Sequence, residues 1–189
     1  MEGGDAVRKV EVVPHDSSRR ETFDTEARAV TVSLGDTVQE VHHIGSTAIP
    51  GIHAKPVIDM LVEVESLAAV DRHEESMNCL GYEGLGEYGI PGRRYFRKDS
   101  AAGIRTHHVH VFEQGSAEVG RHLTFRDYMK THPDEARAYS ELKERLARAH
   151  PNDIESYMDG KDAFIKAVDR KAARWRAEKD NAQKDNVPQ

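Results

Sequence analysis

The sequence predicts an α+β fold, in which a mixed β-sheet flanked by helices carries a C-terminal helical portion. Short β-prone runs predominate between about residues 10 and 115. From about 116 to 178, apolar residues instead recur at helical spacing in three successive segments. We therefore expect a single domain over residues 1–180, followed by a disordered tail over 179–189, which is polar and lacks periodicity.

Hydrophobic periodicity and turn signals place the individual elements. The predicted strands cover residues 38–44, 56–64, 82–88, 93–98 and 106–113. The predicted helices cover residues 18–35, 66–79, 117–130, 133–149 and 153–177. The run 56–64 is apolar on both faces apart from Asp59 and Glu63, which indicates a central strand. Ser66 is the candidate N-cap of the helix after that strand, and Gly160 marks a potential break in the last helix.

Composition narrows the class of protein. Of the 189 residues, 32% are charged, 38% are apolar, and the formal net charge is −6. General nucleic-acid binders and membrane-surface binders present a basic face, so this charge argues against both classes. No apolar run approaches the roughly 20 residues that span a bilayer. Cys79, the single cysteine, permits no internal disulfide and is expected to be a small buried hydrophobe, so we predict a cytoplasmic protein.

One stretch combines residues suited to phosphate chemistry. The predicted strand 38–44 delivers Gly45 and Ser46 at its end, and the next strand carries Asp59. Glycine lets the backbone approach a phosphate closely, and the following N–H groups and serine hydroxyl can donate to phosphate oxygens. A carboxylate on the adjacent strand can hold Mg²⁺, while Lys55 supplies a positive charge. The structural alternatives, without a functional role, are a simple turn at Gly45 and a salt bridge at Asp59.

The same segments carry a family resemblance. The pattern of Gly-Ser followed by a downstream aspartate resembles the signature of the nucleotidyltransferase-fold superfamily. More closely, the chain resembles the GrpB family of bacterial proteins, over about residues 10–175. The matching motifs are VPHD at 13–16, HIGSTAIPGIHAKPVID at 43–59, HVHVFEQGS at 108–116 and HLTFRDYM at 122–129. The resemblance implies a nucleotidyltransferase-like mixed sheet, with a core over about 10–115 and C-terminal helices over about 116–178.

The acidic metal site that the superfamily resemblance implies is incomplete. Active nucleotidyltransferases usually carry a second carboxylate two residues after the first, and here that position is Leu61. Glu63 faces the same side of the strand, but at about 3.3 Å per residue its Cα lies about 13 Å from that of Asp59. Two catalytic metals lie only about 4 Å apart, so Glu63 is a poor substitute.

Histidines could replace the missing acids. His108 and His110 are two residues apart on a predicted strand, so their side chains face one way. If that strand lies beside the one bearing Asp59, the three residues form a candidate catalytic and metal-binding trio, which suits Mn²⁺, Fe²⁺ or Zn²⁺ better than Mg²⁺. The imidazoles could alternatively bind phosphate, act as acid and base, or serve a structural role.

Further candidate phosphate ligands come from the loop and from a basic cluster. The complete set is Gly45, Ser46, Thr47, Lys55, Arg94 and Arg97. Arginine forks match phosphate oxygens, although a solvated basic face explains the two arginines equally well. Strand alternation sends Arg94 and Arg97 to opposite faces, so at most one of them serves a given site.

Three functions fit these observations. The first is a nucleotidyltransferase-fold protein that binds a nucleotide or another phosphorylated small molecule with a divalent metal, Mg²⁺ or Mn²⁺, and could transfer a nucleotidyl group. The second is a catalytically silent binding or protein-interaction module, which Leu61 favours. The third is a mononuclear metal hydrolase built on Asp59, His108 and His110, with a transition metal.

Overall fold

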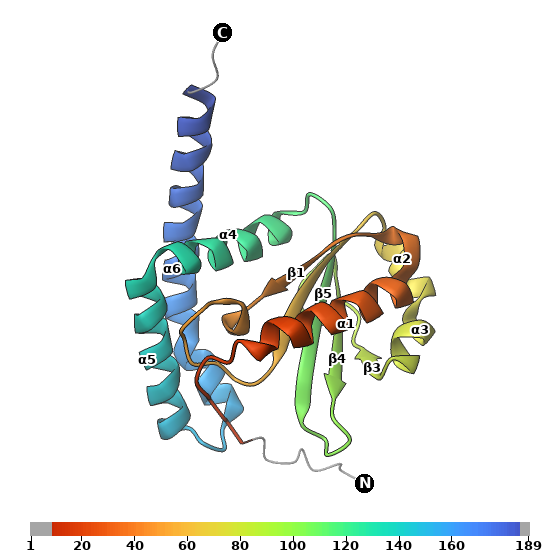
Figure 1. Cartoon of the computed structure of the whole chain (residues 1–189), viewed down its shortest axis with the longest axis horizontal. Helices are drawn as coiled ribbons and strands as arrows, with labels where there is room; N and C mark the ends of the chain where they lie inside the picture. Colours follow the sequence, from red (N-terminus) through yellow and green to blue (C-terminus); the bar gives the residue numbers. More distant parts are fainter. Residues whose placement is uncertain (1–8, 186–189) are drawn as a thin grey trace.

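A five-stranded mixed sheet forms the centre of the molecule (Figure 1). The computed structural model describes residues 9–185. The strands are β1 (Val38–Ile44), β2 (Ile58–Val64), β3 (Tyr82–Gly84), β4 (Arg93–Asp99) and β5 (Arg105–Glu113), in the spatial order β1-β2-β5-β4-β3. Strands β2 and β5 run parallel, and every other neighbouring pair is antiparallel. The predicted mixed sheet and the central position of the strand bearing Asp59 are confirmed.

Helices lie on both sides of this sheet (Figure 1). They are α1 (Ser18–Leu34), α2 (Leu67–Arg72), α3 (Glu74–Cys79), α4 (Ala117–Thr131), α5 (Pro133–Ala149) and α6 (Ile154–Asp185). Two short 3-10 turns, Gly35–Thr37 and Ser46–Ala48, flank β1. The three C-terminal helices pack on one another around Met129, Tyr139 and Val168. The α+β class with a C-terminal helical portion is therefore confirmed.

The two faces of the sheet differ in chemistry. One face is dry: Met60, Val62 and Val109 pack there under α1, α2 and α3 and are fully buried. The opposite face carries Asp59 and His108 at one end, together with the other polar residues Glu63, Arg93, Tyr95, Arg97 and His110. We call this the polar face. It is covered in part by α4 through a small apolar cluster of Ile44, Leu61, Phe112 and Val119.

Two predicted elements are shorter than expected. The helix expected over 66–79 is divided at His73, whose φ of −99° and ψ of 8° interrupt the helix. This turn allows both Val70 on α2 and Met77 on α3 to be fully buried in the same core. The strand expected over 82–88 ends at Gly84. Gly86 and Gly89 have positive φ values of 57° and 81°, and they turn the chain away before β4.

The last helix is longer than expected and has no break. Helix α6 continues through Gly160. The residue at this position is a glycine because a side chain there would meet Leu146 of α5. The glycine permits close approach of the two helices rather than ending one. Residues 179–185 are helical as well, where we predicted a tail, and an i,i+4 pair between Arg176 and Asp180 supports this segment.

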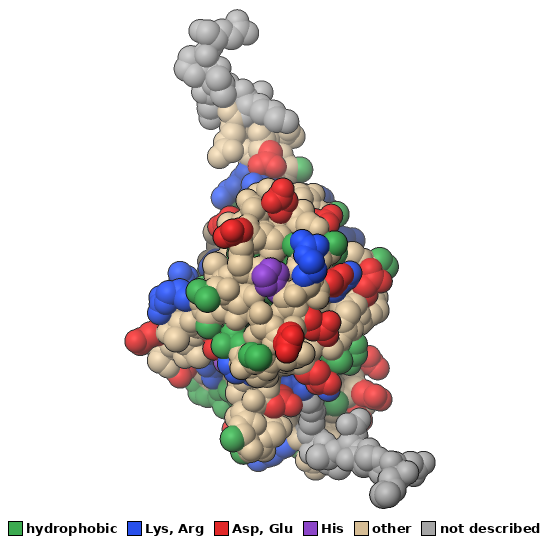
Figure 2. Space-filling model, turned by 90° about the vertical axis from the view of Figure 1, so that its right-hand side faces the viewer, with side chains coloured by type: hydrophobic (Ala, Val, Ile, Leu, Met, Phe, Trp, Pro, Cys, Tyr) green, Lys and Arg blue, Asp and Glu red, His purple; other side chains and the backbone are tan. Residues whose placement is uncertain are grey.

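Neither positive nor negative side chains dominate the face of the molecule that Figure 2 shows. Figure 2 shows acidic, basic and apolar side chains interspersed on one face of the molecule. Cys79 is exposed at the end of α3, so its predicted burial is wrong; the apolar position in this helix is taken by Met77 instead. Within residues 9–185, no helix combines the length and apolar character needed to cross a membrane.

The start of α2 yields a test. The hydroxyl of Ser66 makes no capping hydrogen bond, whereas the carboxylate of Glu113 accepts one from the backbone N–H of Leu67 at 3.1 Å. We expect Glu113→Ala to lower the free energy of unfolding by about 0.5–1 kcal/mol, because the helix loses its cap. Ser66→Ala is the matched control and should be nearly neutral in the same urea titration. The reverse ranking would show that Ser66 is the cap.

Candidate functional site

The backbone of the loop after β1 lies directly against the Asp59 carboxylate. Gly45 has a φ of 67° and a ψ of −171°, a conformation open essentially only to glycine. A Cβ atom at Gly45 would lie 2.4 Å from Asp59 Oδ2, far inside contact distance. Ser46 follows at the start of a 3-10 turn and interacts with Tyr139 of α5. The predicted proximity of the Gly-Ser loop and Asp59 is thus present in the structure.

Asp59 is paired with His108 across the parallel strands. The register of β2 and β5 places these two residues opposite one another, and Asp59 Oδ1 lies 2.9 Å from His108 Nδ1. Burial acts to raise the pKa of Asp59, but the hydrogen bond with His108 and nearby positive charges outweigh it. The pKa therefore lies below its ordinary value, and Asp59 is a carboxylate at neutral pH.

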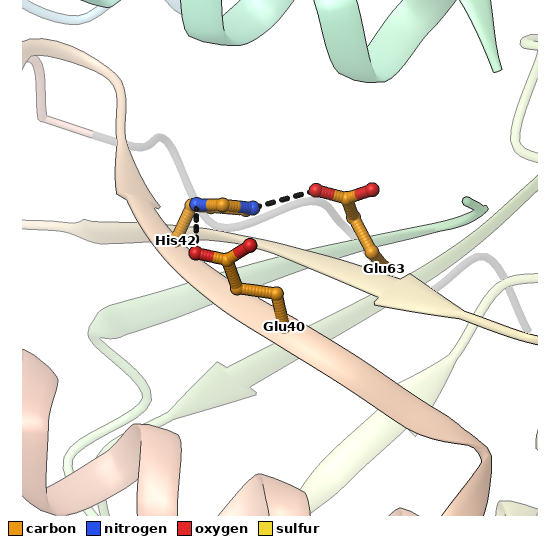
Figure 3. Close-up of side chains that lie close together, drawn as sticks. All are labelled: Glu40, His42 and Glu63. Carbon is orange, nitrogen blue, oxygen red and sulfur yellow. Dashed lines mark hydrogen bonds and ion pairs between the residues drawn. The ribbon is translucent and has the colours of Figure 1, made fainter. Parts of the chain in front are cut away.

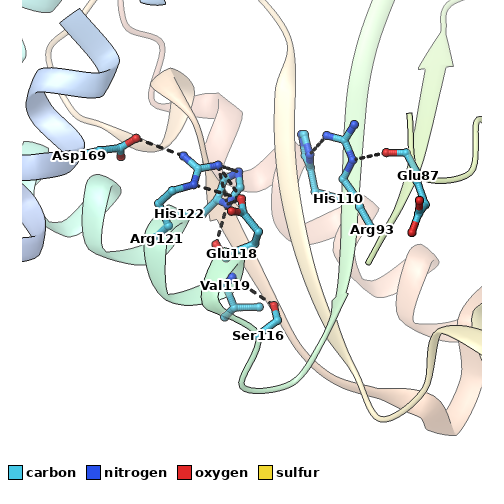
Figure 4. A network of polar contacts seen from close by, with 9 residues as sticks. All are labelled: Glu87, Arg93, His110, Ser116, Glu118, Val119, Arg121, His122 and Asp169. Atoms are coloured by element: carbon cyan, nitrogen blue, oxygen red, sulfur yellow. Dashed lines mark hydrogen bonds and ion pairs between the residues drawn. The ribbon is translucent and has the colours of Figure 1, made fainter. Parts of the chain in front are cut away.

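His110 lies further along the polar face and has a different partner. Its Nδ1 is 3.2 Å from Nη1 of Arg93, whose guanidinium also donates to the carbonyls of Glu87 and Tyr88 (Figure 4). Burial lowers the pKa of His110 to about 3, so the imidazole is neutral. A ring nitrogen facing a guanidinium is poorly placed to bind a cation. The structure therefore brings two members of the predicted trio together and turns the third toward Arg93.

Helix α4 extends this polar network toward α6. Arg121 contacts the carboxylates of Glu118 and Asp169, at 2.9 and 3.4 Å (Figure 4). The ring of His122 lies beside that of His110, with centroids 5.7 Å apart, and Nδ1 of His122 is 2.8 Å from the carbonyl of Glu118. These contacts attach the C-terminal helices to the polar face of the sheet.

Two lysines from the C-terminal helices face Asp59, and sequence analysis missed both. Lys143 on α5 and Lys161 on α6 are 2% and 7% exposed. With Lys55 they form what we call the lysine cluster. Lys161 Nζ lies 4.5 Å from the ring centroid of Tyr157, and Lys55 Nζ lies 5.8 Å from it. All three ammonium groups interact electrostatically with Asp59.

The lysine cluster is rich in buried positive charge. Burial, reinforced by the charge of Lys161, lowers the pKa of Lys143 to about 7. Burial and the charge of Lys55 lower the pKa of Lys161 to about 8. Lys143 donates to the carbonyl of His53, but neither Lys143 nor Lys161 has an ion pair within residues 9–185. Buried cations that make no direct ion pair are costly, and an anionic ligand would offset that cost.

A sequence signal for these lysines does exist. Lys143 lies four residues after Tyr139 and three before Leu146, and so falls on the apolar stripe of α5. Lys161 stands in the same relation to Tyr157 and Phe164 on α6. A lysine in the middle of an apolar helical stripe is rarely buried without a reason. That position indicates a buried cation, and it could have been read from the sequence.

The remaining predicted phosphate ligands do not converge on Asp59. Thr47 Oγ1 lies 2.9 Å from His43 Nε2 and donates to the carbonyl of Val57, so it braces the loop. Arg94 projects from the dry face of the sheet and forms an ion pair with Asp71. Arg97 lies on the polar face opposite His108, but it is paired with Glu83.

Glu63 belongs to a separate polar group. His42 lies between two carboxylates, with Nε2 at 2.7 Å from Glu63 and Nδ1 at 3.5 Å from Glu40 (Figure 3). In the described part of the chain, these three residues form the one group of potential metal ligands whose ligand atoms are close enough together to hold an ion. Figure 3 shows the carboxylates at opposite nitrogens of the ring, so His42 itself is the partner of the buried Glu63. Glu63 therefore does not replace the acid missing at position 61.

Comparisons with known proteins agree on one family. Residues 9–171 match the family model described as GrpB protein. The chain is 46% identical to the UPF0157 protein YqkA of Bacillus subtilis, over 93% of this chain and 50% of the relative. The chain thus spans about half the length of that relative. It is 36% identical to the glutamate-rich protein GrpB of Alkalihalophilus pseudofirmus, over 85% of this chain and 94% of the relative.

A solved structure supports the fold. The crystal structure of the conserved protein GrpB from Enterococcus faecalis is similar to this chain, with a TM-score of 0.84 and 42% identity. The match covers 88% of this chain and 99% of that chain.

The contact between Gly45 and Asp59 predicts a difference between two glycines. Gly51 also has a positive φ, of 76°, but a Cβ there would meet nothing within 4 Å. We expect Gly51→Ala to lower the free energy of unfolding by about 1–3 kcal/mol through backbone strain alone. Gly45→Ala should cost about 1–3 kcal/mol more, because the new methyl group displaces the Asp59 carboxylate.

A double-mutant cycle isolates that contact. In an Asp59→Ala background the carboxylate oxygen is absent, so the excess cost of Gly45→Ala over Gly51→Ala should shrink. Denaturant titrations of the single and double variants measure it. Equal costs for the two glycine variants, or an excess unaffected by Asp59→Ala, would contradict the close approach.

Proposed function

The chain belongs to the GrpB family, and on that premise we propose that it binds a nucleotide or another phosphorylated small molecule, together with a divalent cation. The phosphates would lie between the Gly45–Ser46 loop and the lysine cluster, beside Asp59. The observation that carries this proposal is the burial of Lys143 and Lys161 near Asp59, with no direct ion pair for either lysine within residues 9–185. Phosphate oxygens are the chemical complement of such ammonium groups.

The loop and the cluster would hold different parts of the same ligand. Gly45 lets the backbone lie directly against the Asp59 carboxylate, so a phosphate held by the amides after Gly45 would lie beside that carboxylate. Ser46 is linked to Tyr139 on α5, one helical turn before Lys143. In the proposed complex the loop, α5 and α6 would contact the phosphate from three sides, and the cluster would neutralise its charge.

The residues at Asp59 fit one divalent cation better than two. Asp59 supplies one carboxylate; His108 contacts it through Nδ1 and faces Nη1 of Arg105 with Nε2 at 3.4 Å, so His108 orients the carboxylate and does not supply a ligand. Leu61, at the position of the second acid, is fully buried in an apolar cluster. Mg²⁺ is commonly bound by one or two carboxylates together with phosphate oxygens, which matches this donor set. When bound, such a cation would neutralise phosphate charge; the lysine cluster would supply the remaining positive charge.

Two activities are compatible with this binding site. Nucleotidyl transfer is what the resemblance to the nucleotidyltransferase fold implies. A silent binding module is favoured by Leu61, since the usual second metal ligand is replaced by an apolar side chain. Metal-dependent release of pyrophosphate from a nucleoside triphosphate would assign the first activity, and binding without turnover would assign the second. A hydrolase with Asp59, His108 and His110 as ligands is disfavoured, because His110 faces Arg93.

Thermal shift measures the binding directly. ATP, CTP, GTP and UTP are each added with Mg²⁺ or Mn²⁺ to the wild type and to Asp59→Ala. A ligand at 100 times its Kd stabilises the folded state by about 2.7 kcal/mol, so occupancy raises Tm. We expect a metal-dependent increase that Asp59→Ala reduces or abolishes.

Lys161→Met tests the cluster separately, with Lys166→Met on the same helix as the matched control. Lys166 is exposed and paired with Asp162. Removing the buried charge at Lys161 should raise the Tm of the free protein and lower the ligand-induced shift, whereas Lys166→Met should change neither. No shift with any triphosphate in the folded wild type would contradict the proposed function.

The pH dependence has a defined sign. The pKa values of Lys143 and Lys161 are lowered from 10.5 to about 7 and about 8, so above pH 7 the unfolded chain binds more protons than the folded chain. The stability of the free protein should therefore increase from pH 7 to pH 9, as these two lysines lose their protons.

Phosphate binding should weaken over the same interval, since it requires the ammonium forms. Replacing both lysines by methionine should flatten both trends. Denaturant titrations and phosphate titrations at pH 7, 8 and 9 provide the two profiles. If the stability of the wild type, relative to that of the double variant, instead fell with pH, burial would not disfavour the charged forms of the two lysines.

A further inference from the structure

A cavity of about 360 Å³ opens beside the pair of Asp59 and His108. Apolar side chains of Val57, Ile104 and Ile154 line it, and its polar rim includes Lys55, Arg105 and His108. Ile104 is 63% exposed, at the turn between β4 and β5 where Ser100 N–H donates to its carbonyl.

Two residues that line the cavity also contact the proposed phosphate site. His108 lines the cavity and is hydrogen bonded to Asp59. Lys55 lines it as well and also lies over the ring of Tyr157, to which Lys161 is adjacent. Ile154 opens α6 three residues before Tyr157. The cavity and the lysine cluster therefore share Lys55, which places the two next to one another.

We propose that this cavity binds the base and ribose of a nucleotide whose phosphates occupy the lysine cluster; the inference rests on the proposed function. Its volume lies within the range of about 300–1,000 Å³ found for small-molecule pockets. The aliphatic walls suit the flat faces of a base, while Arg105 and His108 at the rim can reach polar edges. A bare polyphosphate gains nothing from such walls, because charged groups are poorly solvated there. The structure thus favours a nucleoside polyphosphate over inorganic or sugar phosphates.

Calorimetric titration with ATP and with inorganic tripolyphosphate, both with Mg²⁺, separates the two contributions. The ligands carry the same phosphate chain, so their difference reports the nucleoside. We expect ATP to bind at least about tenfold more tightly, which corresponds to about 1.4 kcal/mol.

Variants locate that difference. Ile104→Ser and Ile154→Ser should each weaken ATP binding by roughly threefold to tenfold and leave tripolyphosphate binding unchanged, since they remove apolar contact without changing charge. Val32→Ser is the matched control: Val32 is also an exposed aliphatic residue, 82% exposed, but lies on α1 at the dry face of the sheet. Its affinities should equal those of the wild type.

The outcomes distinguish the inference from the proposal beneath it. Equal affinities for ATP and tripolyphosphate would overturn the nucleoside assignment while leaving a phosphate site intact. Tighter ATP binding that neither isoleucine variant affects would overturn the location. Failure of both ligands to bind the folded protein would overturn the proposed function itself.

Discussion

The ionised carboxylate of Asp59 is the constraint on which the arrangement of this molecule depends. It projects from a central strand, and burial alone would favour its protonated form. The imidazole of His108 on the parallel neighbour β5 and the lysine cluster keep it charged, and the glycine at position 45 leaves room for it. Each feature comes from a different segment, so the loop, the sheet and the C-terminal helices must assemble together around one negative charge.

The division of the sheet into a dry face and a polar face follows from this constraint. Alternation along β2 sends Met60 and Val62 into the core beneath α1, and Asp59 and Leu61 to the other side. The backbone ladder between β2 and β5 fixes their separation, and the dry face buries the sheet against α1, α2 and α3. Helix α4 covers the polar face only in part, through the apolar cluster around Leu61. A rigid sheet with a partly covered polar face positions side chains at the ends of its strands without closing the site.

Local sequence patterns were sufficient for most elements but not for the long-range contacts of the site. The strand 38–44 and the helix 133–149 follow from periodicity and turn residues, and the structure reproduces their bounds. The pairing of Asp59 with His108 follows from strand order, which spacing suggested but could not fix. Local patterns could not predict the role of Arg94, because its carboxylate partner, Asp71, lies on a separate helix. Local patterns also misled at Gly160, since only the packing of α5 against α6 explains a glycine within a continuous helix.

The lysine cluster and the missing acid at position 61 have a common explanation in charge balance. A second carboxylate beside Asp59 would hold a second cation, and both cations would neutralise the phosphates of a ligand. Here Leu61 seals the apolar cluster under α4, and buried lysines from α5 and α6 face the remaining carboxylate. Fixed ammonium groups can neutralise phosphates as metal ions do, but they cannot polarise a bound water as strongly. On the proposed function, a site of this composition is better suited to holding a phosphorylated ligand than to accelerating its hydrolysis.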